Sequence, residues 1–414
     1  MTATYTAPPG PRGGRGTANA ADYALDPLGF LTQAVREFGD VVSLTPSNVL
    51  LAHPDDIGRV LVDRGENVVK ISDGTRRGPT GFPLAMMNSE GADWERKRAR
   101  LRPAFRSERL GQLEQAAREG VARTVGSWAD GQTIDVHHEM SRLAMLVGAA
   151  HIAGREPGEH GEALARAVAA IMRLTSSPRL PAWLPTRVNR DLRRSLRALD
   201  DTLAALVREH GEGGAGTALD ALLADGPPFA EVRDELATLL MSGYETTADA
   251  LTWLLHLLGR NPGAVARMGE EGFASAAAKE AMRLYPPAWV MSRETVRPFE
   301  AGGHTLPPGT VLGLSQWVTH RDERWFPEAG EFRPERWLPG GSGPAHRYAY
   351  FPFGAGPRGC VGASMALREV RVIAAELCAR VRLEPVDPEA VRPRPALALQ
   401  PLGVRAVVRT VSPG

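Results

Sequence analysis

A short segment near the C-terminus constrains this chain more than any other. Residues 353–362 read Phe-Gly-Ala-Gly-Pro-Arg-Gly-Cys-Val-Gly, a glycine-rich loop that places Cys360 just before an apolar helical pattern over 363–380. Glycines can adopt φ above zero and let the backbone approach a flat ligand closely. A helix N-terminus stabilises a thiolate, because unpaired N–H groups and the helix dipole favour negative charge there. The loop therefore predicts a cysteine that is presented as a thiolate ligand.

Two other interpretations of this loop have to be weighed. A free thiol is usually a buried structural residue, and that is the role expected for Cys378 on the following helix. Residues 354–359 also spell G-x-G-x-x-G after a strand-like stretch over 348–353, as in a dinucleotide-binding loop. That site needs an acidic residue at the end of a second strand about 20 residues on. Glu376 has nearly that spacing but lies in the helical pattern, and too little chain follows for a nucleotide domain.

Helical periodicity dominates the rest of the chain, so we predict a mainly α fold with a small β region. Helices are expected over 27–37, 54–63, 92–105, 109–129, 136–152, 162–174, 187–210, 229–259, 262–270 and 272–284. Strands are expected over 41–44, 48–52, 290–296, 310–314, 382–384 and 404–410. We predict a flexible leader rich in Pro and Gly over 1–20, one domain over 21–414 and a flexible link at 211–216.

The composition argues against several classes of protein. Charge is nearly balanced, with 49 Lys and Arg against 48 Asp and Glu, so the whole-chain charge predicts neither a nucleic-acid partner nor membrane binding. Two cysteines allow no disulfide framework and form no C-x-x-C metal site. The N-terminus shows no signal peptide, and no apolar stretch reaches about 20 residues. We therefore expect a cytoplasmic protein without a membrane anchor.

The longest predicted helix carries polar residues in an apolar setting. Ser242, Gly243, Glu245 and Thr246 lie in its middle, with leucines on both sides. Burying polar groups is unfavourable unless they have partners or a function. A threonine can bond back to the carbonyl one turn earlier and a glycine loosens the same turn, so a simple kink is one explanation. A functional pair of acid and hydroxyl is the other. His256, further along this helix, is expected in the core or at an interface rather than as a metal ligand.

Glu280 and Arg283 stand at i and i+3 on the predicted helix over 272–284. Spacing alone favours a solvated surface pair that contributes less than about 1 kcal/mol. A Tyr-Pro-Pro stop follows at 285–287, and a second arginine, Arg336, lies in the segment Phe-Arg-Pro-Glu-Arg-Trp at 332–337.

Basic residues crowd the segment 94–106. Trp94 and Arg98 share a helix face at i and i+4, and a solvated helix face would explain most of the other charges. The surplus charges could instead form a docking patch for an acidic protein; they are Arg96, Lys97, Arg100, Arg102 and Arg106.

The segment around Trp94, the polar group around Thr246, the Glu280 and Arg283 pair and the cysteine loop follow one another along the chain as far as Gly362. Together these four motifs resemble the cytochrome P-450 family over essentially the whole chain. The resemblance implies the family's fold, a single triangular-prism-like domain, and haem b as cofactor, with Cys360 as the axial ligand of the iron. The other residues that it places at the cofactor are Trp94, Arg98, Gly243, Arg293, Phe353, Gly354 and Arg358. Arg98, Arg293 and Arg358 would bind the propionates, because arginine forks suit carboxylates.

The resemblance also assigns roles to the remaining motifs. Thr246 would hydrogen-bond at the oxygen-activation site, and Glu245 would feed it protons from solvent through water. Ser242 departs from the family pattern, which has Ala or Gly there, and adds a hydroxyl beside the haem. Glu280, Arg283 and Arg336 would have a structural role, in which they lock the loop that carries the cysteine.

A haem-thiolate monooxygenase is the function that follows from the resemblance. Such an enzyme inserts one oxygen atom of O2 into an apolar small molecule, while the other leaves as water. The electrons would come from NAD(P)H through an external ferredoxin and its reductase, with the ferredoxin on the proximal basic face, because 414 residues hold no flavin or nicotinamide domain as well. Oxidative coupling or ring formation, peroxide-driven oxidation and a non-catalytic haem sensor remain as alternatives.

Segments 69–88 and 171–187 are expected to build the substrate pocket. Its candidate residues, which would be equally acceptable in the core, are Leu84, Met86, Met87, Trp183, Val290 and Met291. The Ala- and Arg-rich composition is typical of a high-GC actinobacterial genome. It favours a secondary-metabolite scaffold, such as a terpenoid or polyketide, as substrate.

Overall fold

The computed structural model describes residues 5, 7–11, 17–70, 82–106, 110–154, 164, 166–168, 170, 171, 183–210 and 216–411. The chain divides into two compact units. The first consists of residues 1–77 and 279–360, and the second of residues 78–278 and 361–414. We describe each unit by itself, and the single domain expected over 21–414 stays a prediction. Most of the expected link at 211–216 lies outside the described residues.

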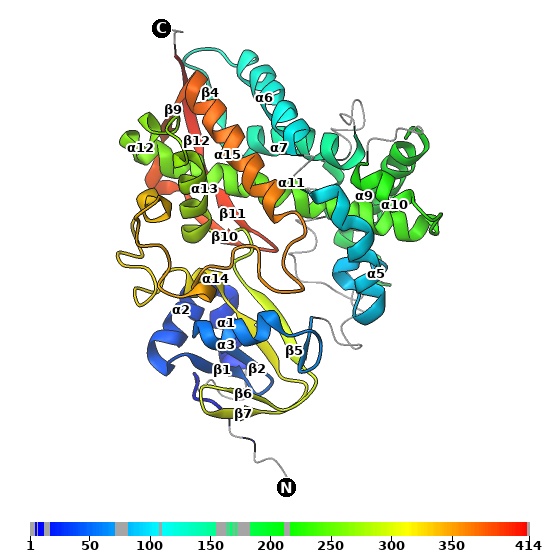
Figure 1. The fold of residues 1–414 in the computed structure, drawn as a ribbon, viewed down its shortest axis with the longest axis vertical. Coiled ribbons are helices and arrows are strands. Elements are labelled where there is room, and N and C mark those ends of the chain that lie inside the picture. The colour runs from blue at the N-terminus through cyan, green and yellow to red at the C-terminus, as the bar shows by residue number, and fades with distance from the viewer. Residues whose placement is uncertain are drawn as a thin grey trace. The chain divides into compact units, whose positions relative to one another are not determined.

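A five-stranded sheet organises the first unit (Figure 1). In spatial order its strands are β1 (Val41–Thr45), β2 (Asn48–Leu51), β8 (Val311–Leu314), β5 (Met291–Thr295) and β3 (Val68–Val69). β2 and β8 run parallel, with Leu51 opposite Leu314, and the other neighbours are antiparallel. A separate hairpin joins β6 (Phe299–Ala301) to β7 (His304–Leu306).

Four α-helices and two 3-10 turns complete the described part of the first unit. They are α1 (Thr17–Leu25), α2 (Pro27–Phe38), α3 (Pro54–Val62), α14 (Gln316–Thr319), η5 (Pro334–Trp337) and η6 (Arg347–Ala349). Both α2 and α3 begin with a proline, whose missing N–H is not needed in the first turn. Ile57 and Leu61 of α3 pack with Leu51, Leu312 and Phe351 in the core of this unit.

Part of the predicted flexible leader is held by this sheet. Pro8 is buried, and the N–H of Ser43 in β1 donates to the carbonyl of Pro9 over 2.8 Å. A side chain on Gly10 would collide with the carbonyl of Ser43. Residues 9 and 10 of the leader therefore lie against β1, and its flexibility stays a prediction.

Helices make up most of the second unit. They are α5 (Gly91–Leu101), α6 (Leu110–Gly126), α7 (Val136–Ala153), α9 (Arg187–Arg208), α10 (Ala218–Leu223), α11 (Phe229–Arg260), α12 (Pro262–Ala266) and α15 (Ala363–Arg380), with the 3-10 turns η2 (Met86–Asn88), η3 (Arg102–Phe105) and η7 (Pro388–Ala390). β12 (Arg405–Thr410) lies between β4 (Thr133–Asp135) and β9 (Val381–Val386) in one small sheet, and β10 (Arg392–Pro395) pairs with β11 (Leu399–Leu402) in another. α13 (Phe273–Leu284) carries the chain back into the first unit.

The long helix α11 forms the centre of the second unit. It contacts α7, α9, α15 and β11, as Figure 1 also shows for its neighbours α7 and α15. Its sequence is apolar on almost every side, and a helix of this kind is stable only in the interior. Trp253 is buried and its indole N–H donates to the carbonyl of Leu399 over 2.9 Å, so the largest side chain of the helix has no unpaired polar atom.

The predicted fold class, mainly α with a small β region, is confirmed. The strand-like stretch over 348–353 forms no strand, because it begins in η6 and continues as a loop. Its burial comes from contacts with distant segments, which a period-two pattern does not report. Six short strands were not predicted (β3, β4, β6, β7, β10 and β11), since two to four residues are too few to show a period. No described helix is both long and apolar enough to cross a bilayer.

Candidate active site

Residues 353–360 of the predicted cysteine loop lie in the first unit and are shaped by hydrogen bonds of their own backbone. The N–H of Cys360 donates to the carbonyl of Phe353 over 2.9 Å, and that of Gly359 to the carbonyl of Gly356 over 3.1 Å. Gly354 and Gly356 have φ of 66° and 65°, the left-handed conformation that glycine adopts without strain. The loop geometry therefore depends on the residue type at both positions.

One of these glycines also packs too closely for a side chain. A Cβ on Gly356 would collide with the carbonyl of Leu61, at the end of α3. The thiol that the loop presents is exposed, whereas Cys378 is half-buried and burial raises its pKa to about 11. Of the two thiols, Cys360 is therefore the more accessible one.

Glu280 of α13 is the centre of a buried charged cluster in the same unit. Arg283 donates from Nε and Nη2 to the two oxygens of Glu280, each over 2.9 Å. Arg336 of η5 donates to Oε1 over 3.0 Å, and the indole of Trp337 donates to Oε2 over 2.8 Å. The side chains of Glu280 and Arg283 are fully buried. The structure thus brings the three residues of the predicted structural set together, and their pairing is not the surface bridge that spacing alone favoured.

His320 links this cluster to the segment just before the cysteine loop. Its carbonyl accepts from Arg283 Nη1 over 2.8 Å, and its Nε2 accepts from the N–H of Phe351 over 3.0 Å. Burial lowers the pKa of His320 well below its ordinary value, so the ring is neutral and Nε2 can accept. Tyr350 adds a second link, because its ring centroid lies 4.4 Å from that of Trp337. Sequence reasoning missed His320, whose role depends on contacts far along the chain.

The predicted acid and hydroxyl lie on α11 in the second unit. The hydroxyl of Thr246 donates to the carbonyl of Ser242 over 2.6 Å, and that of Thr247 to the carbonyl of Gly243 over 2.7 Å. Both are the bonds one turn back that the sequence suggested, yet α11 remains α-helical from Phe229 to Arg260. Thr246 is half-buried, and the hydrogen bond that its hydroxyl makes is exposed.

Glu245 is buried and is held from the C-terminal strands. Its Oε1 accepts from Nε2 of Gln400 in β11 over 2.8 Å. The Gln400 side-chain oxygen in turn accepts from Nε of Arg394 in β10 over 3.0 Å. This chain of contacts fixes one carboxylate oxygen of Glu245 beside the paired strands β10 and β11.

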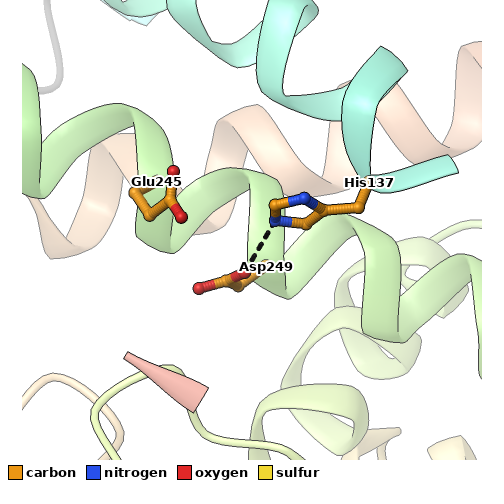
Figure 2. A group of neighbouring side chains, drawn as sticks. All are labelled: His137, Glu245 and Asp249. Carbon is orange, nitrogen blue, oxygen red and sulfur yellow. Dashed lines mark hydrogen bonds and ion pairs between the residues drawn. The ribbon is translucent and has the colours of Figure 1, made fainter. Parts of the chain in front are cut away.

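Two further polar residues adjoin Glu245, and sequence reasoning missed both. Figure 2 shows Asp249 one turn beyond Glu245 on α11, with His137 reaching it from the start of α7. His137 Nε2 lies 3.0 Å from Asp249 Oδ1, and single atoms of the three side chains lie within 4.8 Å of one another. The available signal was a second carboxylate at i+4 in an apolar helix. His256 on the same helix is buried against Trp253, in line with the core interpretation.

The residues expected at the haem propionates divide between the units. In the second unit the guanidinium of Arg98 lies over the ring of Trp94 on α5, 5.6 Å from its centroid. In the first unit Arg293 is buried in β5, and its Nη1 donates to the carbonyl of Ser292 over 2.7 Å. Arg358 is half-buried in the cysteine loop.

The predicted pocket residues are mostly not core residues. Leu84 and Met87 are 43% and 44% exposed, and Trp183 is 77% exposed. Met86 of the second unit is half-buried, as are Val290 and Met291 of the first. The rest of the two expected pocket segments, 71–81 and 172–182, lies outside the described residues.

Acidic residues of α11 hold the segment that carries Leu84 and Met86. The N–H of Leu84 donates to Asp234 over 2.9 Å, and that of Met86 donates to Glu235 over 2.6 Å. Burial raises the pKa of Glu235 to about 7. The backbone that positions these apolar side chains is therefore anchored at both residues.

The expected docking patch needs a correction at three of its five positions. Lys97 is only 4% exposed, and its ammonium donates to the carbonyl of Leu84 and to Asp93, each over 2.7 Å. Arg96 and Arg100 both donate to Glu231 of α11, over 3.0 and 2.8 Å.

The expectation of five surplus charges is therefore wrong for Arg96, Lys97 and Arg100. Their charges are paired with carboxylates of the protein itself. Lys97 pairs with Asp93 one turn away on α5, and the two arginines pair with Glu231 on α11. Arg102 and Arg106 are exposed and remain candidates for a docking surface.

Comparison with known proteins extends along almost the whole chain. A model of the family described as cytochrome P-450 matches residues 8–407. Cyclooctatin synthase of Streptomyces melanosporofaciens is 31% identical over 423 residues, which cover 91% of this chain and 90% of that protein. Cyclooctat-9-en-7-ol 5-monooxygenase of the same organism is 32% identical over 397 residues, which cover 87% and 86%. Among solved structures, a six-coordinated cytochrome P-450 of Thermus thermophilus gives a TM-score of 0.78 at 28% identity, over 93% of this chain and 98% of that one.

Proposed function

The chain belongs to the cytochrome P-450 family of haem monooxygenases, and from this premise we propose that it inserts one oxygen atom of O2 into an apolar small molecule. The observation that carries the proposal is the exposed thiol of Cys360, at the end of a glycine loop that the buried Glu280 cluster braces. A structural cysteine would be buried, and a surface cysteine would not need this support.

The residues present fit a haem group. The loop leaves its thiol exposed, and its glycines keep side chains off the surface beside that thiol. With thiolate ligation, haem supplies activation of O2 and cleavage of the O–O bond. In our proposal Cys360 ligates the iron and Phe353 lies on the thiolate side. Gly354 of the same loop would also lie at the cofactor.

Three arginines supply the counter-charges that haem needs. Propionates are carboxylates, and the planar fork of Arg98, Arg293 or Arg358 matches them with paired N–H donors. The contact between Arg98 and Trp94 orients one of these forks in advance. The protein's contribution here is binding and orientation of the cofactor.

Thr246 and Glu245 are proposed to handle protons. The hydroxyl hydrogen of Thr246 points back to the Ser242 carbonyl, so its oxygen is left as an acceptor and its proton can be exchanged. Glu245, one residue before it, is the nearest carboxylate along the helix and acts as general acid. Ser242 Oγ also donates one turn back, to the Thr238 carbonyl, over 2.5 Å, so the extra hydroxyl is already satisfied.

The ligation is tested with the carbon monoxide complex of the reduced protein. The wild-type chain should show the red-shifted Soret band of thiolate ligation. Cys360→Ser should abolish that band, and the matched variant Cys378→Ser should keep it. A wild-type protein that binds haem without this band would overturn the proposal.

A secondary-metabolite scaffold is the proposed substrate class, with a cyclic terpenoid as its most specific form. One relative is named for a cyclic unsaturated alcohol that it oxygenates, and the exposed apolar residues Leu84, Met87 and Trp183 suit such a molecule. Spin-state titration with cyclic terpenoids and with polyketides tests this choice, since a substrate that displaces water from iron shifts the haem spectrum.

An external ferredoxin and its reductase are proposed to deliver electrons from NAD(P)H. Arg102 and Arg106, the two exposed arginines after α5, are the residues we assign to the docking surface. The cytoplasmic location stays a prediction.

A further inference from the structure

Asp249 is a buried carboxylate that the function described so far does not use. It is 0% exposed, and its Oδ2 has no hydrogen-bond partner in the described part of the chain. Burying a carboxylate in an apolar helix is strongly unfavourable unless the group is paired or functions there. A structural contact between α7 and α11 would need only the oxygen that His137 contacts, Asp249 Oδ1. The unpaired Oδ2 therefore calls for an explanation.

Glu245 has two polar connections toward the surface, and they differ in chemistry. The first runs through Gln400 to Arg394. An amide does not titrate, and a guanidinium stays protonated at any ordinary pH, so this branch can orient Glu245 but cannot pass protons to it.

The second connection consists of an imidazole and a carboxyl group, both of which can take up and release a proton. Asp249 lies one turn from Glu245, and His137 contacts Asp249 over 3.0 Å. The side chain of His137 is 27% exposed. This branch therefore leads from the buried Glu245 to the protein surface in two steps (Figure 2).

We propose that His137 and Asp249 form the route by which solvent protons reach Glu245. This inference rests on the proposed monooxygenase function, in which Glu245 is the acid that must be reprotonated in each turnover. His137 and Asp249 act through Glu245, so they are relay residues and not catalytic ones.

The proton balance of the route is simple. His137 takes a proton from water at Nδ1, and its Nε2 proton passes to Asp249 Oδ1. Rotation of the carboxyl group about its Cβ–Cγ bond turns the protonated oxygen toward Glu245, which takes the proton directly or through one water molecule, a span that the 4.8 Å limit allows. A flip of the imidazole restores its first tautomer, so one proton enters and one is delivered.

The ionisation of the pair is consistent with this role. Burial raises the pKa of Asp249 to about 7, with Glu245 adding to the rise, while the hydrogen bond from His137 and the charge of Arg394 oppose it. Burial opposes the charged form of His137, but Asp249, Glu245 and Asp135 together raise its pKa above the ordinary value. Burial thus brings the pKa of Asp249 to about 7, and the neighbouring carboxylates raise that of His137.

The first test follows the two groups spectroscopically in the full-length protein. The histidine resonances of the isotope-labelled chain report the His137 pKa, and the infrared carbonyl stretch of a protonated carboxyl reports Asp249. Asp249→Asn should remove that stretch and lower the His137 pKa. His256 provides the internal control, since burial lowers its pKa to about 4 and the charges that act on it are those of Arg260 and Glu389.

The second test measures coupling, the product formed per NAD(P)H consumed, with a surrogate redox pair. Asp249→Asn and His137→Gln keep hydrogen-bonding atoms in place but cannot pass a proton. Each variant should lower coupling by roughly tenfold, a smaller loss than the removal of a direct general acid would cause. Each should also raise the solvent isotope effect and flatten the pH dependence of coupling across neutral pH. His256→Gln, which changes a buried histidine of α11 outside the route, should leave all three unchanged.

Each outcome separates the route from the function on which it rests. A wild-type protein without the thiolate spectrum overturns the proposed function and the route with it. A coupled wild type in which Thr246→Ala uncouples, but in which both relay variants keep their coupling and pH profile, overturns the route alone. Stoichiometric binding of Zn2+ or Mn2+ that needs Asp249 also overturns it, because the three side chains would then hold a metal. If Asp249→Asn does not fold, the half-exposed His137→Gln variant still decides.

Discussion

Glu369, near the middle of α15, is 1% exposed, and neither carboxylate oxygen has a hydrogen-bond partner within the described ranges. Burial raises its pKa from 4.5 to about 8. The folded protein therefore keeps this proton over a pH range in which the unfolded chain releases it. Because the folded-state pKa is the higher one, stability is fully present below about pH 4.5 and is lost as pH rises toward about 8. The loss is about 1.4 kcal/mol for each pH unit.

Glu369→Leu removes this titration at the scale of one residue. The free energy of unfolding by denaturant, measured at several pH values, should fall less steeply with pH in the variant, which should be the more stable protein at the alkaline end. Glu376→Gln on the same helix is the matched control, since Glu376 is half-exposed and paired with Arg380, and its slope should match the wild type. Parallel pH profiles for wild type and Glu369→Leu would contradict the prediction.

At the scale of elements, two pairs of Glu and Arg with the same spacing have opposite environments. Glu280 and Arg283 are fully buried and share their charges with Arg336. Arg267 and Glu270, also three residues apart, are 35% and 53% exposed. Removing one partner of a buried ion pair leaves an uncompensated charge in the interior and typically destabilises by about 3–5 kcal/mol. An exposed pair contributes less than about 1 kcal/mol.

Glu280→Ala should therefore destabilise the chain by about 3–5 kcal/mol, because it strands two buried guanidinium groups. It should also loosen the cysteine loop, because Arg283 supports His320 and His320 accepts from Phe351. Thermal unfolding and the fraction of protein with the thiolate spectrum measure the two effects. Glu270→Ala is the control, and equal losses in the two variants would contradict the argument.

These pairs also show how far the sequence could lead. Helical periodicity predicted the mainly α fold, and the run of glycines predicted the cysteine loop, because both are local patterns of the sequence. It could not rank two identical i, i+3 pairs by burial, since burial depends on what packs above them. For the same reason Lys97 was expected on the surface although it lies in the interior, and Asp249 and His137, 112 positions apart, were not connected.

At the scale of the whole molecule, charge is almost balanced, with a formal net charge of +1. Such a protein offers little long-range attraction to an acidic electron donor, so association depends on local charges. Ion pairs within the protein neutralise Arg96, Lys97 and Arg100. The exposed charges that could attract a donor near α5 are therefore Arg102 and Arg106. Arg102 begins η3, and Arg106 directly follows it.

Reversing both charges, Arg102→Glu with Arg106→Glu, should raise the Michaelis constant for ferredoxin by roughly tenfold, or about 1.4 kcal/mol. The rate at saturating ferredoxin should stay unchanged, because rim charges act mainly on encounter. The increase in the Michaelis constant should be smaller at high salt, because the Debye length, about 8 Å at physiological ionic strength, becomes shorter there. Arg187→Glu, which reverses a 92% exposed arginine at the start of α9, is the control and should leave the constant near the wild-type value. If the double variant keeps the wild-type constant at low ionic strength, the donor does not dock on these arginines.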